Sequence, residues 1–259
     1  MPEEAIQHEK ALRKFAKHIQ KGLNKGSKVN EQKLPYGLVP MRDIIPEGVS
    51  GDALIRHYEV TEQGAALHNL KCAINGNSEM SIVPGKHVML LVNGEIMMSD
   101  TPYEARSNRD IIEAARGKVL IAGLGMGMVL VPILQNPAVT SVTVVEKNNN
   151  VIKLVYKSLV ENGPFTPNEK MKLVLVPGDI FDFKPKPDSY DIIYFDIWPS
   201  ISTKILKDAA ILRKQFKNSL RKAGWMGVWV EKLAMKRQVE DRAAIARARA
   251  FRARMKAKQ

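Results

Sequence analysis

Three glycines at alternate positions, Gly123, Gly125 and Gly127, interrupt an otherwise apolar stretch of this chain, "VLIAGLGMGMVL". Glycine weakens both strands and helices, so the cluster favours a tight turn or a close approach of backbone to a ligand. Because Met128 stands where a third glycine would complete Gly-x-Gly-x-x-Gly, the dinucleotide fingerprint is not matched. No Lys-Ser or Lys-Thr follows, so a triphosphate loop is not indicated either. A packing turn and a turn against another nucleoside-bearing ligand both stay open.

Three acids end the apolar segments that follow: Glu146 after "SVTVV", Asp179 after "LVLVPG" and Asp196 within "YFDIW". A carboxylate at the end of the second strand can accept hydrogen bonds from both hydroxyls of a ribose, which is the role expected of Glu146. We expect Asp179 to bind an exocyclic amine and Asp196 to lie at the bottom of a cleft. With the glycine turn, the acids predict a nucleoside-binding site with Asp196 as the catalytic candidate.

The segments around these residues alternate between strand and helix patterns. Their strands are almost continuously apolar, which is typical of a parallel sheet covered on both faces. No clear final pair of strands follows the last one, so a shortened sheet is expected. The expected strands are 118–123, 141–147, 171–179, 190–198 and 225–232, and the expected helices are 101–117, 128–136, 150–162 and 202–224.

The fold class predicted is α/β: a Rossmann-like, doubly wound, mostly parallel sheet with a small N-terminal antiparallel β-domain and helical basic ends. In the β-domain, short β-prone pieces alternate with Gly, Asn and Pro, and "VNGE" is a hairpin signal. The expected domains are a helical N-terminal arm (1–33), the β-domain (34–99), the Rossmann-like cofactor-binding domain (100–232) and a basic helical tail (233–259).

Charge is concentrated at the two ends of the chain, whose net charge is +13. Residues 232–259 hold ten Lys and Arg against Glu240 and Asp241, and residues 1–33 carry a net charge of +4. Such basic ends favour contact with a polyanion such as nucleic acid. The alternative is that they are helices whose charged surface is simply exposed to solvent.

Compartment and partners follow from simpler features. No apolar run approaches the roughly 20 residues that span a bilayer, so no membrane is expected as a partner. A single cysteine, Cys72, and an N-terminus without an apolar signal region favour the cytoplasm. The five histidines show no metal-ligand spacing, so no metal is expected. A homo-oligomer stays open.

The motifs "VLIAGLGMG", "VTVVEKN", "PGDIFDF" and "YDIIYFDIWPS" resemble, in order and spacing, those of class I S-adenosylmethionine-dependent methyltransferases, spermidine synthase-like branch. The resemblance covers roughly residues 55–232. It implies S-adenosylmethionine as cofactor, with the three glycines against its methionine and ribose parts. It further implies that Glu146 binds the ribose hydroxyls, that Asp179 binds the adenine amine, and that Asp196 faces the sulfonium and the acceptor.

Three further residues are candidates for contact with the substrate. Tyr103 and Glu104 precede the first parallel strand and either close over the cofactor or cap a helix. Trp198 either walls the cleft, where a sulfonium gains from an aromatic face, or packs in the core.

Three functions stay open. The first is a methyltransferase of unknown acceptor, which aligns donor and acceptor in a cleft beside Asp196. The second is an aminopropyltransferase that uses decarboxylated cofactor and a polyamine. The acids that bind the polyamine in aminopropyltransferases are poorly represented here, because the glycine loop carries Met126 and "DIWPSIST" has no second acid. Putrescine is therefore expected to be a poor acceptor. The third is a nonenzymatic nucleic-acid-binding protein that keeps the fold.

Overall fold

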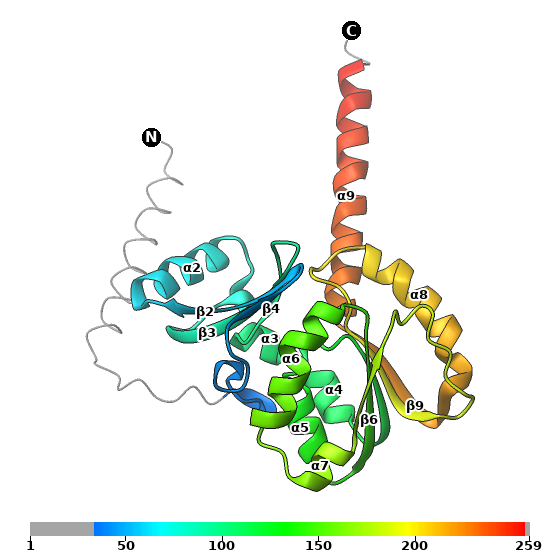
Figure 1. Cartoon of the computed structure of the whole chain (residues 1–259). Coiled ribbons are helices and arrows are strands. Elements are labelled where there is room, and N and C mark those ends of the chain that lie inside the picture. Colours follow the sequence, from blue (N-terminus) through cyan, green and yellow to red (C-terminus); the bar gives the residue numbers. More distant parts are fainter. Residues whose placement is uncertain (1–33, 257–259) are drawn as a thin grey trace.

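The computed structural model describes residues 34–256, so the predicted arm over 1–33 lies outside the described residues, as do 257–259. The predicted fold class is confirmed. A five-stranded parallel sheet and a four-stranded antiparallel sheet lie side by side (Figure 1). Among the described residues, no helix combines the length and the apolar character needed to cross a membrane.

The parallel sheet has the strand order β7-β6-β5-β8-β9, and every neighbouring pair in it is parallel. Chain order reverses around β5, which pairs with both β6 and β8, and ligands of doubly wound sheets bind at such a point. Its strands are β5 (Gly117–Ala122), β6 (Val139–Glu146), β7 (Leu173–Pro177), β8 (Tyr190–Phe195) and β9 (Leu220–Val228). The sheet is thus shortened, as expected: within residues 34–256 it has no strand beyond β9.

Helices cover both faces of this sheet, with α5 and α6 on one side and α8 on the other (Figure 1). This arrangement buries the four consecutive residues Val119, Leu120, Ile121 and Ala122 of β5. The helices are α3 (Pro102–Ser107), α4 (Arg109–Ala114), α5 (Leu130–Gln135), α6 (Asn149–Asn162), α7 (Pro167–Met171), α8 (Lys204–Phe216) and α9 (Glu231–Lys256).

Two predicted helices have different bounds in the structure. The helix expected over 101–117 is divided at Asn108, whose φ of −97° and ψ of 6° are not helical. The helix expected over 202–224 ends at Phe216, and β9 begins at Leu220 opposite Tyr190. Charged residues after 216 give that segment a helical pattern, but pairing with β8 decides its conformation.

The antiparallel sheet has the order β1-β2-β3-β4, with strands β1 (Gly48–Ser50), β2 (Ala53–Val60), β3 (Gly85–Val92) and β4 (Glu95–Ser99). The predicted Asn-Gly hairpin is confirmed: Asn93 and Gly94 have φ of 52° and 77°, as a type I′ turn requires. Helix α2 (Glu62–Ile74), between β2 and β3, was not expected. Thr61 caps its N-terminus by accepting a hydrogen bond from the Gly64 N–H through its side chain, a capping signal that the strand interpretation overlooked.

The antiparallel sheet is held against the beginning of α6. Ser50 Oγ donates to Asn150 Oδ1 at 3.1 Å, and the Asp52 carboxylate accepts from the side-chain amides of Asn148 and Asn150. Buried side chains of β2 and β3 belong to the same apolar cluster as those of β5 and β6. The two sheets therefore share one core, and the edge of β3 and β4 lies beside the glycine turn.

Candidate functional site

A cavity lies at the carboxyl ends of β5, β6, β7 and β8, where the sequence placed the site. Three of the parallel strands bring their terminal acids to it, and the antiparallel sheet forms another wall through Leu90, Val92, Met97 and Met98. The predicted site residues that line it are Gly123, Gly125, Glu146, Asp179, Asp196, Glu104 and Trp198. The predicted site residues Gly127 and Tyr103 do not line this cavity.

The glycine turn brings β5 close to both β8 and the antiparallel sheet. Gly123 has φ of 97°, and a Cβ there would collide with the backbone oxygen of Asp196. Gly125 has φ of 52°, and a Cβ there would collide with Met98 Sδ. That sulfur accepts a hydrogen bond of 3.0 Å from the Met126 N–H, so a side chain of β4 rests directly on the turn. Both glycines are therefore needed by contacts within the protein.

Gly127 has a packing role. With φ of 73°, it lies against Leu159 of α6, and a Cβ would collide with the leucine side chain. Of the two explanations that the sequence left open for the glycines, the packing turn accounts for this position.

Glu146 connects the ends of β5 and β6. Its Oε2 accepts a hydrogen bond of 2.8 Å from the Leu124 N–H, and its Oε1 accepts one of 2.7 Å from the Asn148 N–H. These bonds fix the carboxylate at the cavity edge, while each oxygen keeps a second lone pair. A pair of hydroxyl groups on a ligand could donate to it there.

Asp179 lies at the end of β7, after Gly178. Its Oδ1 accepts a hydrogen bond of 3.0 Å from the Phe181 N–H, which fixes the side chain in a local turn. Oδ2 has no hydrogen-bond partner among the described residues, so it is available to a donor such as an amine. The structure thus places Asp179 at the cavity with Glu146 and Asp196.

Asp196 and Glu104 form a pair of carboxyl groups in the cavity wall. Burial raises the pKa of Asp196 to about 7. Burial, and then repulsion from the charge of Asp196, raises the pKa of Glu104 to about 8. Near neutral pH Glu104 is therefore mostly protonated while Asp196 is partly ionised, and Asp196 suits a group that receives a proton from a reacting nucleophile.

The aromatic residues near this pair are held by hydrogen bonds. Trp198 lines the cavity, and its Nε1 donates to Asp208 Oδ2 on α8 at 2.8 Å. Tyr194 is packed in the core, where its hydroxyl donates to Asn108 Oδ1 at 3.3 Å. Burial raises the pKa of the Tyr194 hydroxyl well above its usual value, so it remains a donor.

Several cavity residues were missed by the sequence reasoning. Met97 and Met98 come from the antiparallel sheet, whose placement over the glycine turn no spacing in the sequence revealed. Trp229 follows β9 directly, lines the cavity, and donates from Nε1 to Ser107 Oγ at 3.0 Å. Its position after a parallel strand was a usable signal, because ligands bind at the carboxyl ends of such strands. Among residues 34–256, no group of three or more His, Cys, Asp or Glu side chains could hold a metal ion.

No family model matches the chain, and no curated protein matches it. Similar solved structures include spermidine synthase from Thermotoga maritima, 16% identical, with a TM-score of 0.42 over 72% of this chain and 56% of that one. An S-adenosylmethionine-dependent methyltransferase from Mesorhizobium loti is 15% identical, with a TM-score of 0.34 over 46% of this chain and 51% of that one.

Phosphoethanolamine N-methyltransferase 1 from Haemonchus contortus, in complex with S-adenosylhomocysteine, is 12% identical, with a TM-score of 0.36 over 47% of this chain and 24% of that one. The chain spans about half the length, or less, of the first solved structures that it matches. Similarity at this level carries no functional argument, so function has to come from the residues of the site.

Proposed function

We propose that the protein is an S-adenosylmethionine-dependent methyltransferase that acts on a nitrogen nucleophile. The observation that carries the proposal is Glu146, whose carboxylate is fixed by two backbone N–H groups beside the glycine turn, in one cavity with Asp179 and Asp196. This donor and acceptor set fits a nucleoside. The carboxylate of Glu146 would accept from the ribose hydroxyls, and Asp179 Oδ2 would accept from the exocyclic amine of adenine.

The bound cofactor would supply a methyl group on a positively charged sulfur, and the protein's own residues would do the rest. Asp196, whose pKa is raised to about 7, would take up the proton that the amine releases. Glu104, whose pKa of about 8 keeps it mostly protonated near neutral pH, would help to orient the amine. Trp198 and the apolar side chains Leu90 and Met97 would exclude water from the reacting groups.

Calorimetric titration with S-adenosylmethionine and S-adenosylhomocysteine tests the proposal. The Glu146→Gln variant should bind each ligand about 5- to 150-fold more weakly, from the loss of about 1–3 kcal/mol of charge-assisted hydrogen bonding. Glu95→Gln, which removes an exposed carboxylate of β4 outside the cavity, is the matched control and should bind normally. Equal affinities for the Glu146 variant and the control, or no binding by the unaltered protein, would contradict the assignment.

A second candidate, aminopropyl transfer to a polyamine, is favoured by one observation. The sequence lacked a second acid near Asp196, but the fold brings Glu104 of α3 near it: burial raises the pKa of Glu104, and repulsion from the charge of Asp196 raises it further. Once ionised, two neighbouring carboxyl groups would suit a cationic amine, whose charge would in turn favour their ionisation. Supplying decarboxylated cofactor with putrescine separates the two candidates: appreciable spermidine formation, abolished in Asp196→Asn, would replace methyl transfer by aminopropyl transfer.

A further inference from the structure

An open groove adjoins the cavity and connects it to helix α9. The two hollows share Met97, Met98, Glu104 and Trp229, so the groove opens onto Glu104, while Asp196 lines the cavity beyond it. The predicted substrate residue Tyr103 lines the groove. An acceptor that enters along the groove would therefore meet Glu104 before it reaches Asp196.

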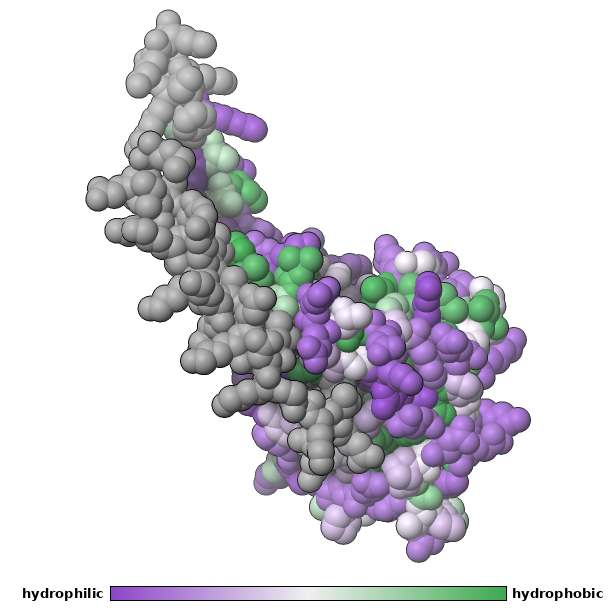
Figure 2. Space-filling view, turned by 90° about the vertical axis from the view of Figure 1, so that its left-hand side faces the viewer, coloured by the Kyte–Doolittle hydropathy of each residue, from purple (hydrophilic) through white to green (hydrophobic). Residues whose placement is uncertain are grey.

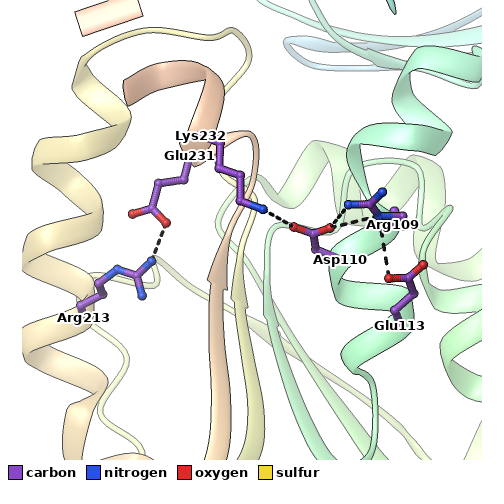
Figure 3. Close-up of polar contacts among 6 residues, drawn as sticks. All are labelled: Arg109, Asp110, Glu113, Arg213, Glu231 and Lys232. Carbon is purple, nitrogen blue, oxygen red and sulfur yellow. Dashed lines mark hydrogen bonds and ion pairs between the residues drawn. The ribbon is translucent and has the colours of Figure 1, made fainter. Parts of the chain in front are cut away.

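Helix α9 forms one wall of this groove and then leaves the body of the protein (Figure 1). Its first turns are anchored (Figure 3): Glu231 Oε2 accepts from Arg213 of α8 at 2.6 Å, and Lys232 Nζ lies 3.8 Å from Asp110 of α4. Arg237 also donates to the Ile201 carbonyl at 2.9 Å. The last groove residue on α9 is Asp241, and every residue from there to 250 is exposed.

The projecting part of α9 is strongly basic. From residue 242 to the end of the chain there are seven Lys and Arg and no acid. The side chains of Arg242, Arg247, Arg249 and Arg252 are exposed, and none takes part in an ion pair among the described residues. At about 1.5 Å per residue, the helix from Arg242 to Arg252 is about 15 Å long. A nucleic-acid strand has one phosphate about every 3.4 Å, so four or so phosphates would lie along this length.

The distribution of side chains on α9 favours a nucleic acid as its partner over a membrane surface or a second copy of the helix. Binding in a membrane interface requires an apolar face separated from the charged one. A helical dimer requires an apolar seam at heptad positions. Between Arg242 and Ala250, where the structure describes every side chain, alanines are interspersed with arginines and Ile245 is the one large apolar residue. In the space-filling view, the strip of the projecting helix that is not hidden shows both hydrophilic and apolar residues (Figure 2).

We propose that α9, from Arg242 onward, binds the phosphate backbone of a nucleic acid and so presents a base to the groove that leads to Glu104 and Asp196. This inference rests on the proposed methyl transfer and identifies its acceptor as an amino group of a nucleobase. Carboxylates accept hydrogen bonds from such amines, whereas they repel phosphates. The basic helix would therefore bind the phosphate backbone of the nucleic acid, and the acidic cavity would bind one of its bases.

The binding test uses the full-length protein with a fluorescently labelled single-stranded RNA and a DNA of the same sequence. The variant replaces Arg242, Arg247, Arg249 and Arg252 by Gln. A matched control removes four exposed charges elsewhere, by replacing Lys153, Lys207, Lys214 and Lys222 with Gln. The unaltered protein and the control should bind at least one of the two nucleic acids. For both, the slope of log K against log of the salt concentration should be steeper by about 3 than the slope for the arginine variant. Between about 50 and 200 mM salt, their affinity should fall on the order of 50-fold more than that of the variant.

Equal slopes and affinities for the three proteins would overturn the inference, as would binding to phosphatidylserine vesicles without binding to nucleic acid. Transfer of labelled methyl groups to the bound nucleic acid tests delivery: the arginine variant should lose transfer while it keeps its affinity for S-adenosylmethionine. Binding through α9 without any transfer would refute the assignment of the acceptor. Normal cofactor binding without nucleic-acid binding would refute only this inference, whereas the absence of cofactor binding would refute the proposed function.

Discussion

Replacing Glu104 by Gln should make the protein more stable at alkaline pH, although the change removes a residue of the candidate site. Glu104 is buried, and its pKa rises from 4.5 to about 8 in the folded protein. Below pH 4.5 the carboxyl is neutral in both the folded and the unfolded chain. Between the two values the folded state holds a proton that the unfolded state has released, so stability falls as pH rises.

The magnitude follows from the two pKa values. Each tenfold difference in proton affinity corresponds to about 1.4 kcal/mol, so above pH 8 ionised Glu104 costs the folded state on the order of 4–5 kcal/mol. Gln has nearly the same shape and no charge, so the variant escapes this cost. Asp196 titrates in both proteins, so the difference between them reports the ionisation of Glu104 together with its repulsion from Asp196.

Urea denaturation followed by circular dichroism, at intervals from pH 5 to pH 9, measures the difference in unfolding free energy. The advantage of Glu104→Gln should grow through the window from about pH 4.5 to about pH 8 and then level off. Glu95→Gln, at an exposed position, should show no such growth. Parallel stability profiles for the unaltered protein and the Glu104 variant would mean that the carboxyl of Glu104 is solvated, and its proposed role beside Asp196 would lose its physical basis.

Two further predictions concern single contacts. Gly127→Ala should lower the stability by more than about 1 kcal/mol, because the new Cβ collides with Leu159 at a φ of 73°, and the folded fraction should keep its affinity for S-adenosylmethionine. A calorimetric loss of affinity in the folded variant would instead make Gly127 a ligand contact. Arg213→Gln should speed amide hydrogen exchange in the first turns of α9, because Glu231 loses its anchor, and unchanged exchange there would show that packing alone holds the helix.

Local patterns in the sequence determined the parallel half of the fold and most of the cavity. Three of the strands are short apolar runs that end in an acid or are followed closely by one, and parallel strands bring their carboxyl ends to one edge of the sheet. Glu146, Asp179 and Asp196 could therefore be grouped without knowing any contact between them. The hairpin at Asn93 and Gly94 was equally local, because two residues with positive φ define the turn.

Other features depended on contacts between distant segments, which no local pattern encodes. The role of Gly127 is set by Leu159 on the next helix, and the beginning of β9 is set by its pairing with β8. Glu104 became the partner of Asp196 only when α3 packed near the end of β8. Burial raises the pKa of both carboxyls, and repulsion from Asp196 further raises the pKa of Glu104. Composition alone identified the basic tail, but only the tertiary structure connects α9 to the groove, because that contact depends on where the last strand ends.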